Sequence, residues 1–196
     1  MQVIEPVTLT GKHVRLEPLG MQHLNEIYEA GNYESIWTYM SRVIRSVEDA
    51  TEFIEQALHA QRAGTDLPFA ILSLETGKVI GSTRFMNISA RDKRLEIGFT
   101  WLTPAVWKTT VNTECKWLLL RHCFEQLKLN RVEFKTDARN LNSQRAIARI
   151  GGVKEGVFRK HMIVRDGYVR DSVYFSIVDT DWPHVDQKLK MCLNGE

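Results

Sequence analysis

Residues 94–137 read RLEIGFTWLTPAVWKTTVNTECKWLLLRHCFEQLKLNRVEFKTD, and this stretch decides the fold. Residues 94–102 and 132–137 have the composition of β-strands, and residues 112–127 carry the apolar pattern of a long helix. A strand, a helix and a second strand in this order imply a parallel crossover inside a mixed sheet. The helix begins soon after a strand, and α/β folds often bind anionic ligands at such a point.

The sequence on either side predicts the remaining helices and strands. Ser46 and Asp49 have the spacing of a capping box, so a helix is expected to start there and to end near Gly64. Asp166-Gly167 is a strong hairpin signal. The other expected elements are strands at 13–18, 69–74, 79–87, 153–164 and 170–178, and helices at 21–30, at 143–150 with Asn142 as N-cap and Gly151 as C-cap, and after Trp182-Pro183.

Composition and charge exclude several classes of protein. The chain has 196 residues and 43% hydrophobic content, which suits one globular domain and is too high for a disordered chain. Its 26 basic and 24 acidic residues give a net charge of only +2, so we expect no nucleic-acid partner. No apolar run approaches the ~20 residues that span a bilayer, and the first residues lack the pattern of a signal peptide.

The three cysteines, Cys115, Cys123 and Cys192, have no spacing typical of a metal site. Such a sparse and odd set indicates reduced thiols, and two of them fall within the apolar pattern of the long helix. We therefore expect a cytoplasmic protein that has no metal and no membrane partner.

A series of short motifs carries a resemblance to a known family. In chain order they are Glu96-Ile97-Gly98-Phe99, Leu102-Thr103-Pro104, Trp107 through Glu114, Leu129 through Val132, Asn140 through Gly151, Glu155 through Arg159, and Asp166 through Asp171. Their order and spacing resemble the GNAT superfamily of acyl-CoA N-acyltransferases, and within it the branch of ribosomal-protein N-terminal acetyltransferases (RimJ and RimL type). The resemblance covers residues 9–182. It implies an α/β fold in one domain, residues 1–196, with a mixed, mostly antiparallel sheet of about seven strands and helices on both faces.

The same resemblance implies a function. The enzyme would transfer the acetyl group of acetyl-CoA to a primary amine, on a protein N-terminus or a small molecule, by direct attack with help from a general base. Related proteins often pair, so a homodimer is also implied. The alternative is a CoA-binding module on the same fold with little or no turnover.

In this family a glycine-rich loop wraps the CoA diphosphate where a helix starts, because the first helical N–H groups lack internal partners and carry partial positive charge. Family members usually have glycine at the positions of Lys108 or Thr110, and this chain has none there. Either the loop follows an ordinary backbone path, or its affinity for CoA is lower. The missing glycines therefore favour the alternative of a CoA-binding module. The resemblance assigns coenzyme contacts to Trp107, Lys108, Thr109, Thr110, Val111, Asn112 and Thr113, to the backbone of Thr100, Trp101 and Leu102, and to Asn140 and Ser143.

Glu96 is the general base that the resemblance implies. A carboxylate whose pKa is raised by partial burial accepts the proton of an amine, directly or through a water. Leu95 and Ile97 flank this residue, so its side chain points to the other face of the strand. The alternative is a glutamate on the exposed face of that strand.

Ser143 is the corresponding candidate acid. In RimL-like enzymes a serine three residues after an asparagine is thought to protonate the departing thiolate, and Asn140 and Ser143 match that spacing. Serine is a poor acid against a thiol whose pKa is near ~8.5, so we interpret its role as hydrogen-bond donation to sulfur. Many members of the superfamily use a tyrosine four residues further on, where this chain has Ile147. The alternatives are that Ser143 only supports the helix start and that Asn140 is an ordinary loop residue.

Overall fold

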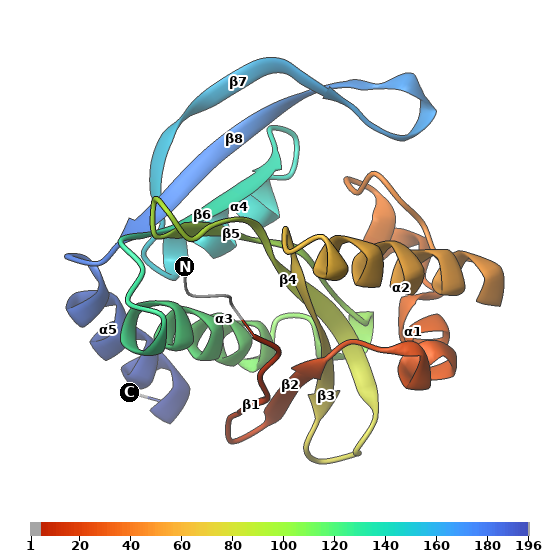
Figure 1. The fold of residues 1–196 in the computed structure, drawn as a ribbon, viewed down its shortest axis with the longest axis horizontal. Coiled ribbons are helices and arrows are strands. Elements are labelled where there is room, and N and C mark those ends of the chain that lie inside the picture. Colours follow the sequence, from red (N-terminus) through yellow and green to blue (C-terminus); the bar gives the residue numbers. More distant parts are fainter. Residues whose placement is uncertain (1–4, 196) are drawn as a thin grey trace.

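The structure is a computed structural model that describes residues 5–195. Eight strands and five α-helices follow one another along the chain (Figure 1). The strands are β1 (Leu9–Thr10), β2 (Val14–Pro18), β3 (Leu67–Ser73), β4 (Val79–Ser89), β5 (Arg94–Leu102), β6 (Arg131–Asp137), β7 (Val153–Ile163) and β8 (Val169–Val178). The helices are α1 (Leu24–Gly31), α2 (Val47–Arg62), α3 (Val111–Arg121), α4 (Leu141–Arg149) and α5 (Trp182–Asn194).

All eight strands form one sheet, in the order β1-β2-β3-β4-β5-β6-β8-β7. Within the part of the chain that the structure describes, only β5 and β6 pair in parallel, so the predicted crossover through the long helix is confirmed. Helices α1 and α2 cover one face of the sheet, and α3 and α5 cover the other (Figure 1). The expected fold is confirmed, with eight strands in place of about seven because a two-residue edge strand precedes β2.

Helix α2 starts where its cap was predicted. The Ser46 side chain accepts a hydrogen bond from the Asp49 amide at 3.2 Å, and the Asp49 carboxylate accepts one from the Ser46 amide at 3.1 Å. This reciprocal pairing satisfies two amides that the helix itself leaves without partners. Behind the cap, Ala50, Phe53 and Ile54 are fully buried, as the apolar spacing predicts.

Helix α4 begins earlier than predicted. The Asn140 side chain accepts a hydrogen bond from the Ser143 amide at 3.0 Å, so Asn140 is the N-cap. The prediction of Asn142 as N-cap is wrong, because that residue already lies in the first turn with its side chain exposed. The helix ends at Arg149 with Ile150 as its C-cap, so the prediction of Gly151 as C-cap is one residue late. Gly151 follows with φ of 98°, the left-handed conformation that favours glycine just after a helix.

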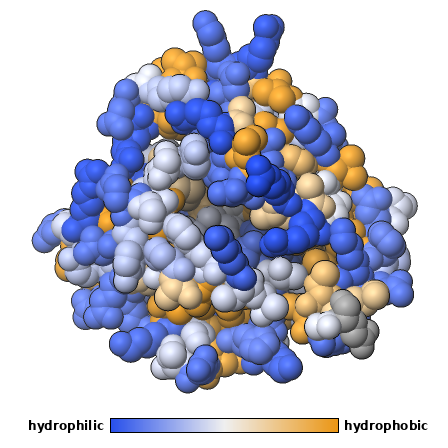
Figure 2. Space-filling view, turned by 180° about the vertical axis from the view of Figure 1, so that it is seen from behind, coloured by the Kyte–Doolittle hydropathy of each residue, from blue (hydrophilic) through white to orange (hydrophobic). Residues whose placement is uncertain are grey.

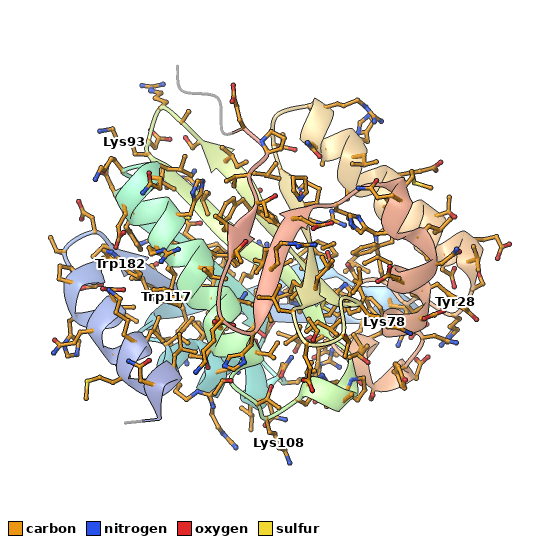
Figure 3. The ribbon with its side chains drawn as sticks, turned by 90° about the horizontal axis from the view of Figure 1, so that it is seen from below. Tyr28, Lys78, Lys93, Lys108, Trp117 and Trp182 are labelled. Carbon is orange, nitrogen blue, oxygen red and sulfur yellow. The ribbon has the colours of Figure 1, made fainter. Side chains whose placement is uncertain are left out.

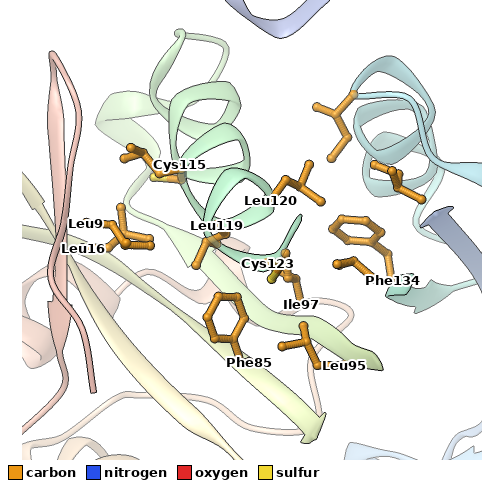
Figure 4. Packing of buried hydrophobic residues seen from close by; sticks show 14 of the residues in the cluster. Leu9, Leu16, Phe85, Leu95, Ile97, Cys115, Leu119, Leu120, Cys123 and Phe134 are labelled. Atoms are coloured by element: carbon orange, nitrogen blue, oxygen red, sulfur yellow. The ribbon is translucent and has the colours of Figure 1, made fainter. Parts of the chain in front are cut away.

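The sheet separates two hydrophobic cores. The core on the α3 face contains Phe85, Ile97, Leu119 and Phe134 (Figure 4). The core under α1 and α2 contains Trp37, Phe53 and Trp101, whose rings pack edge to face or tilted. Because strand side chains alternate between faces, the two cores determine which residues of β5 and β6 face α3.

Burial accounts for two of the cysteines. Cys115 and Cys123 are free and fully buried on α3 and in the π-helical turn that continues it, η4 (His122–Gln126). Burial raises the pKa of the Cys115 thiol to about 12 and that of Cys123 well above its usual range, so both thiols are neutral. The expectation that two cysteines belong to the apolar side of the long helix is confirmed for this pair, whereas Cys192 is exposed.

Strands β7 and β8 form a long hairpin that arches away from the rest of the sheet (Figure 1). At its tip Asp166 and Gly167 both have positive φ, of 62° and 72°, as expected for a tight Asp-Gly turn. Arg165 beside them lies 3.3 Å from the Glu34 carboxylate, in the short helical segment η2 (Glu34–Trp37). The hairpin tip therefore reaches the segment between α1 and α2.

The surface opposite to the view of Figure 1 is mainly hydrophilic, with hydrophobic residues in separate small patches (Figure 2). None of the helices within residues 5–195 is long and apolar enough to cross a membrane.

Candidate active site

The two parallel strands separate soon after they meet. Strands β5 and β6 pair only where Arg94–Glu96 lie beside Arg131–Glu133, although β5 continues to Leu102 and β6 to Asp137. Beyond Glu96 the edge of β5 that faces β6 therefore has no strand partner among the described residues. Strand β5 also contains a β-bulge at this point, because Phe99 has φ of 48° and the register of β5 with β4 shifts there. A bulge bends its strand.

Two helices start at the end of this opening. Parallel strands end at the same edge of a sheet, so the residues after β5 and those after β6 lie on that edge. Strand β5 leads through a short turn, η3 (Pro104–Val106), to the start of α3, and β6 leads directly to the start of α4. Both helix starts bring unpaired amides and partial positive charge to the opening.

The loop before α3 contains no glycine, yet one of its residues adopts a backbone conformation that favours glycine. Lys108 adopts φ of 63°, in the left-handed region, whereas Thr110 has helical angles of −72° and −12°. The loop therefore departs from the ordinary backbone path at Lys108 and keeps it at Thr110. The Lys108 side chain is exposed and extends away from the body of the molecule (Figure 3).

The polar side chains of this loop differ in what they contact. The Thr109 hydroxyl donates to the Val106 carbonyl at 2.7 Å and accepts from the Val111 amide at 3.3 Å. Thr113 is buried, and Thr110 is exposed and makes no capping hydrogen bond. Among the three threonines of this loop that were expected to contact the coenzyme, only Thr110 has a hydroxyl that is exposed and makes no hydrogen bond within the described residues.

Glu96 lies on β5 at the last residue before the strands separate. Its side chain is buried, so the alternative of an exposed surface glutamate is wrong. The carboxylate accepts a hydrogen bond from the Asn87 amide group at 2.9 Å and lies 3.4 Å from the Lys135 ammonium. Gly98 keeps the space beside it open, because a Cβ there would lie 3.1 Å from the Glu96 oxygen.

Three residues near Glu96 were not predicted from the sequence: Lys135 on β6, and His161 and Tyr174 on the hairpin. His161 lies 3.1 Å from the Ser172 hydroxyl and 3.4 Å from that of Tyr174. Burial lowers the pKa of His161, and the positive charges of Lys135 and Arg170 lower it further. Burial and the charge of Glu96 raise the pKa of Tyr174.

An alternating strand pattern could have placed Lys135 on the Glu96 face, since its neighbour Phe134 belongs to the opposite core. Nothing in the sequence indicates how the hairpin curves, so neither His161 nor Tyr174 could have been found in that way.

The remaining predicted residues fall into separate roles. The Asn140 side chain caps α4 by accepting a hydrogen bond from the Ser143 backbone amide, so a structural role is observed for the Asn140 side chain. The Trp101 side chain packs in the core under α1 and α2, which leaves only its backbone for a ligand. Trp107 is exposed at 44%, and its ring nitrogen donates to the Leu102 carbonyl at 2.8 Å. Within residues 5–195, no group of three or more His, Cys, Asp or Glu residues is arranged to hold a metal ion.

Comparison with known proteins gives the family. Residues 13–153 match the model of the acetyltransferase (GNAT) domain. A relative with the name "Putative ribosomal N-acetyltransferase YdaF", from Bacillus subtilis, is 29% identical over 109 residues, which cover 56% of this chain and 58% of YdaF. The chain thus aligns with somewhat more than half the length of that relative.

Solved structures agree with this match. A GCN5-related N-acetyltransferase from Brucella melitensis superposes with a TM-score of 0.90 at 29% identity and covers 96% of this chain and 86% of its own. RimJ from Mycobacterium smegmatis, in complex with CoA disulfide, has a TM-score of 0.79 at 21% identity, with 96% of this chain and 93% of RimJ covered, and so shares the fold. The family model spans most of the chain, and the chain therefore belongs to the GNAT family of acetyltransferases.

Proposed function

We propose that the chain transfers the acetyl group of acetyl-CoA to a primary amine. The observation that carries this proposal is the opening between β5 and β6, which begins directly after Glu96 and is flanked by two helix starts. An extended, anionic ligand suits such an opening, because its chain can pair with a free strand edge while its phosphates meet unpaired helix amides.

The residues present suit CoA. Its diphosphate would lie on the amides of Asn112 and Thr113 at the start of α3, with the Thr110 hydroxyl and the Lys108 ammonium beside it. Its pantetheine arm would run along the free edge of β5 from Thr100 to Leu102. The left-handed φ of Lys108 supports this, because it gives the loop the shape that glycine usually provides.

In this proposal Glu96 accepts the proton of the attacking amine, directly or through a water. Its carboxylate is buried and held by Asn87 and Lys135, so its position is fixed. A backbone amide of Thr100–Leu102 holds the acetyl oxygen, on which negative charge develops. The Ser143 hydroxyl donates a hydrogen bond toward sulfur, next to Asn140, whose side-chain NH₂ contacts the pantetheine arm.

The acceptor is proposed as a protein N-terminus or a small-molecule amine. The name of YdaF refers to ribosomal acetylation, which makes peptides with a free N-terminus the first acceptors to test. The acceptor would enter between the hairpin and the segment before α2, where Arg165 and Glu34 meet. A homodimer and a cytoplasmic location stay predictions.

The test is calorimetric titration of the chain with CoA, followed by thiol release from acetyl-CoA in the presence of peptide and polyamine mixtures, with acetylated products identified by mass. We expect binding and thiol release that depends on the acceptor. Binding without release would select the CoA-binding module, and an absence of binding would refute both functions.

We expect Glu96→Gln to lower turnover by about 10²-fold or more, which is the usual contribution of a general base. The pH optimum should rise, because the amine must then lose its proton to solvent before it attacks. Glu133→Gln is the matched control. Glu133 is the residue of β6 opposite Glu96 in the parallel pairing, and its carboxylate forms an ion pair with Arg131. Equal rates for wild type and Glu96→Gln would contradict the assignment.

A further inference from the structure

Lys116 is a buried cation that the proposed mechanism does not use. It lies in the second turn of α3 with 7% of its surface exposed. Its ammonium donates a hydrogen bond to the Thr100 hydroxyl at 2.6 Å, and the hydroxyls of Thr100 and Thr83 are 2.7 Å apart. Among residues 5–195, the only polar partner of this ammonium is therefore a neutral hydroxyl on β5.

The ammonium contacts both strands that separate. Thr100 belongs to β5 just beyond the bulge, and Phe134, whose ring centre lies 5.9 Å from the ammonium, belongs to β6. Lys116 thus approaches the two separated strands from the α3 side, whereas Glu96 faces the other side of the sheet. A ligand that enters the opening would lie between these two residues.

The charged groups around Lys116 do not balance its charge. No carboxylate within residues 5–195 forms an ion pair with it, since Glu114 beside it turns away to bind the backbone before β2. Cys115 is a neutral thiol, and His122, further along the helix, is stacked on Phe85.

The side chains that β4, β5 and β6 present to this face are apolar or are threonines. Burial lowers the pKa of Lys116 to about 8, so the charged and neutral forms are close in free energy near neutral pH.

We infer that Lys116 donates the proton that the sulfur of CoA gains when the acetyl group leaves. The inference rests on the proposed function, which lays the pantetheine arm beside Thr100. As the carbon–sulfur bond breaks, its electron pair goes to sulfur, and one proton of the Lys116 ammonium moves to that sulfur, which leaves a free thiol and a neutral lysine. The proton of the amine goes to Glu96, and both side chains are restored by exchange with water.

This assignment explains the burial of the lysine. Burying an ammonium without a carboxylate partner in an apolar site costs free energy. Part of that cost is recovered when an anion forms beside the ammonium, because the two charges then attract each other. A lysine ammonium whose pKa is near that of a thiol also transfers a proton to the departing thiolate more readily than the Ser143 hydroxyl does. In this arrangement the Ser143 hydroxyl is only a neutral hydrogen-bond donor toward sulfur, and its backbone amide is bonded to Asn140 in the α4 cap.

The test measures the ionisation of CoA bound to the protein, which requires no acceptor. The thiolate is followed by its ultraviolet absorbance from pH 6 to pH 10, and the same protein saturated with desulfo-CoA supplies the background from tyrosine. Because an adjacent ammonium favours the thiolate, we expect the midpoint for wild type to lie at least about one pH unit below that for Lys116→Met. Methionine fills a similar volume and removes the charge.

Two further variants separate charge from structure. Lys116→Arg keeps a cation and is expected to keep the low midpoint, while its turnover falls because guanidinium does not give up a proton. Ser143→Ala removes only a neutral donor near sulfur, so it is expected to raise the midpoint by less than Lys116→Met does.

If CoA fails to bind wild type, the proposed function is refuted. If CoA binds and Lys116→Met has the same midpoint as wild type, the inference alone is overturned. Acetylation of Lys116 itself on incubation with acetyl-CoA would also overturn it, because the amine would then be a nucleophile.

Discussion

The strained lysine in the coenzyme loop gives a prediction about both stability and binding. Lys108 has φ of 63°, and its exposed side chain makes no hydrogen bond or ion pair within the described residues. The left-handed conformation costs an ordinary residue about 1–2 kcal/mol. Glycine removes that cost but loses about 0.5–1 kcal/mol through its greater freedom in the unfolded chain. We therefore expect Lys108→Gly to raise the free energy of unfolding by about 0.5–1 kcal/mol.

The same substitution removes a charge that the proposed function places beside phosphate. An exposed point charge contributes about 0.5–1 kcal/mol, so we expect CoA to bind Lys108→Gly about 2- to 5-fold more weakly at low salt. Lys108→Ala separates the two effects, because alanine keeps the strain and loses the charge. It should weaken CoA binding equally without stabilising the fold.

Urea unfolding and calorimetric titration with CoA measure the two quantities. Thr110→Gly is the matched control in the same loop, because Thr110 has ordinary helical angles and gains nothing from glycine. We expect that control to be neutral or less stable than wild type. The reasoning would be refuted if Lys108→Gly were destabilised, or if Thr110→Gly were stabilised as much.

Two other predictions concern stability. Glu114 is buried and accepts hydrogen bonds from the backbone amides of residues 12–14 at 2.6, 2.9 and 3.1 Å. Glu114→Ala should therefore lower the free energy of unfolding, measured in urea, by about 2–4 kcal/mol. A loss below about 1 kcal/mol would contradict this role. Hydrogen bonding to Arg131 lowers the pKa of Glu155 from 4.5 to about 2. The stabilising contribution of Glu155 is therefore complete above pH 4.5 and is lost as pH falls toward 2. The difference in unfolding free energy between wild type and Glu155→Gln should shrink over that range, and a constant difference would contradict the ion pair.

Elements with strong local signals could be predicted from the sequence. The capping box at Ser46 and Asp49 and the Asp-Gly turn of the hairpin depend on contacts between residues close in the chain, and both are confirmed. The cap of α4 was assigned wrongly because Asn140 and Asn142 both suit a helix start, and only the backbone geometry selects Asn140.

Features that depend on how distant segments meet could not be predicted. The parallel pairing of β5 and β6 stops after Glu96, although the pattern of both strands continues beyond it. It determines that Lys135 lies beside Glu96 and that Lys116 reaches Thr100. A lysine within a helical sequence pattern is usually interpreted as a solvated residue. The burial of Lys116 is therefore seen only in the folded structure.

A crystal structure of the chain with bound acetyl-CoA tests the central claim most directly. The account predicts that the coenzyme fills the opening between β5 and β6, with its diphosphate on the amides of Asn112 and Thr113 and its thioester between Glu96 and Lys116. A coenzyme bound outside this opening, with the opening left empty, would contradict it.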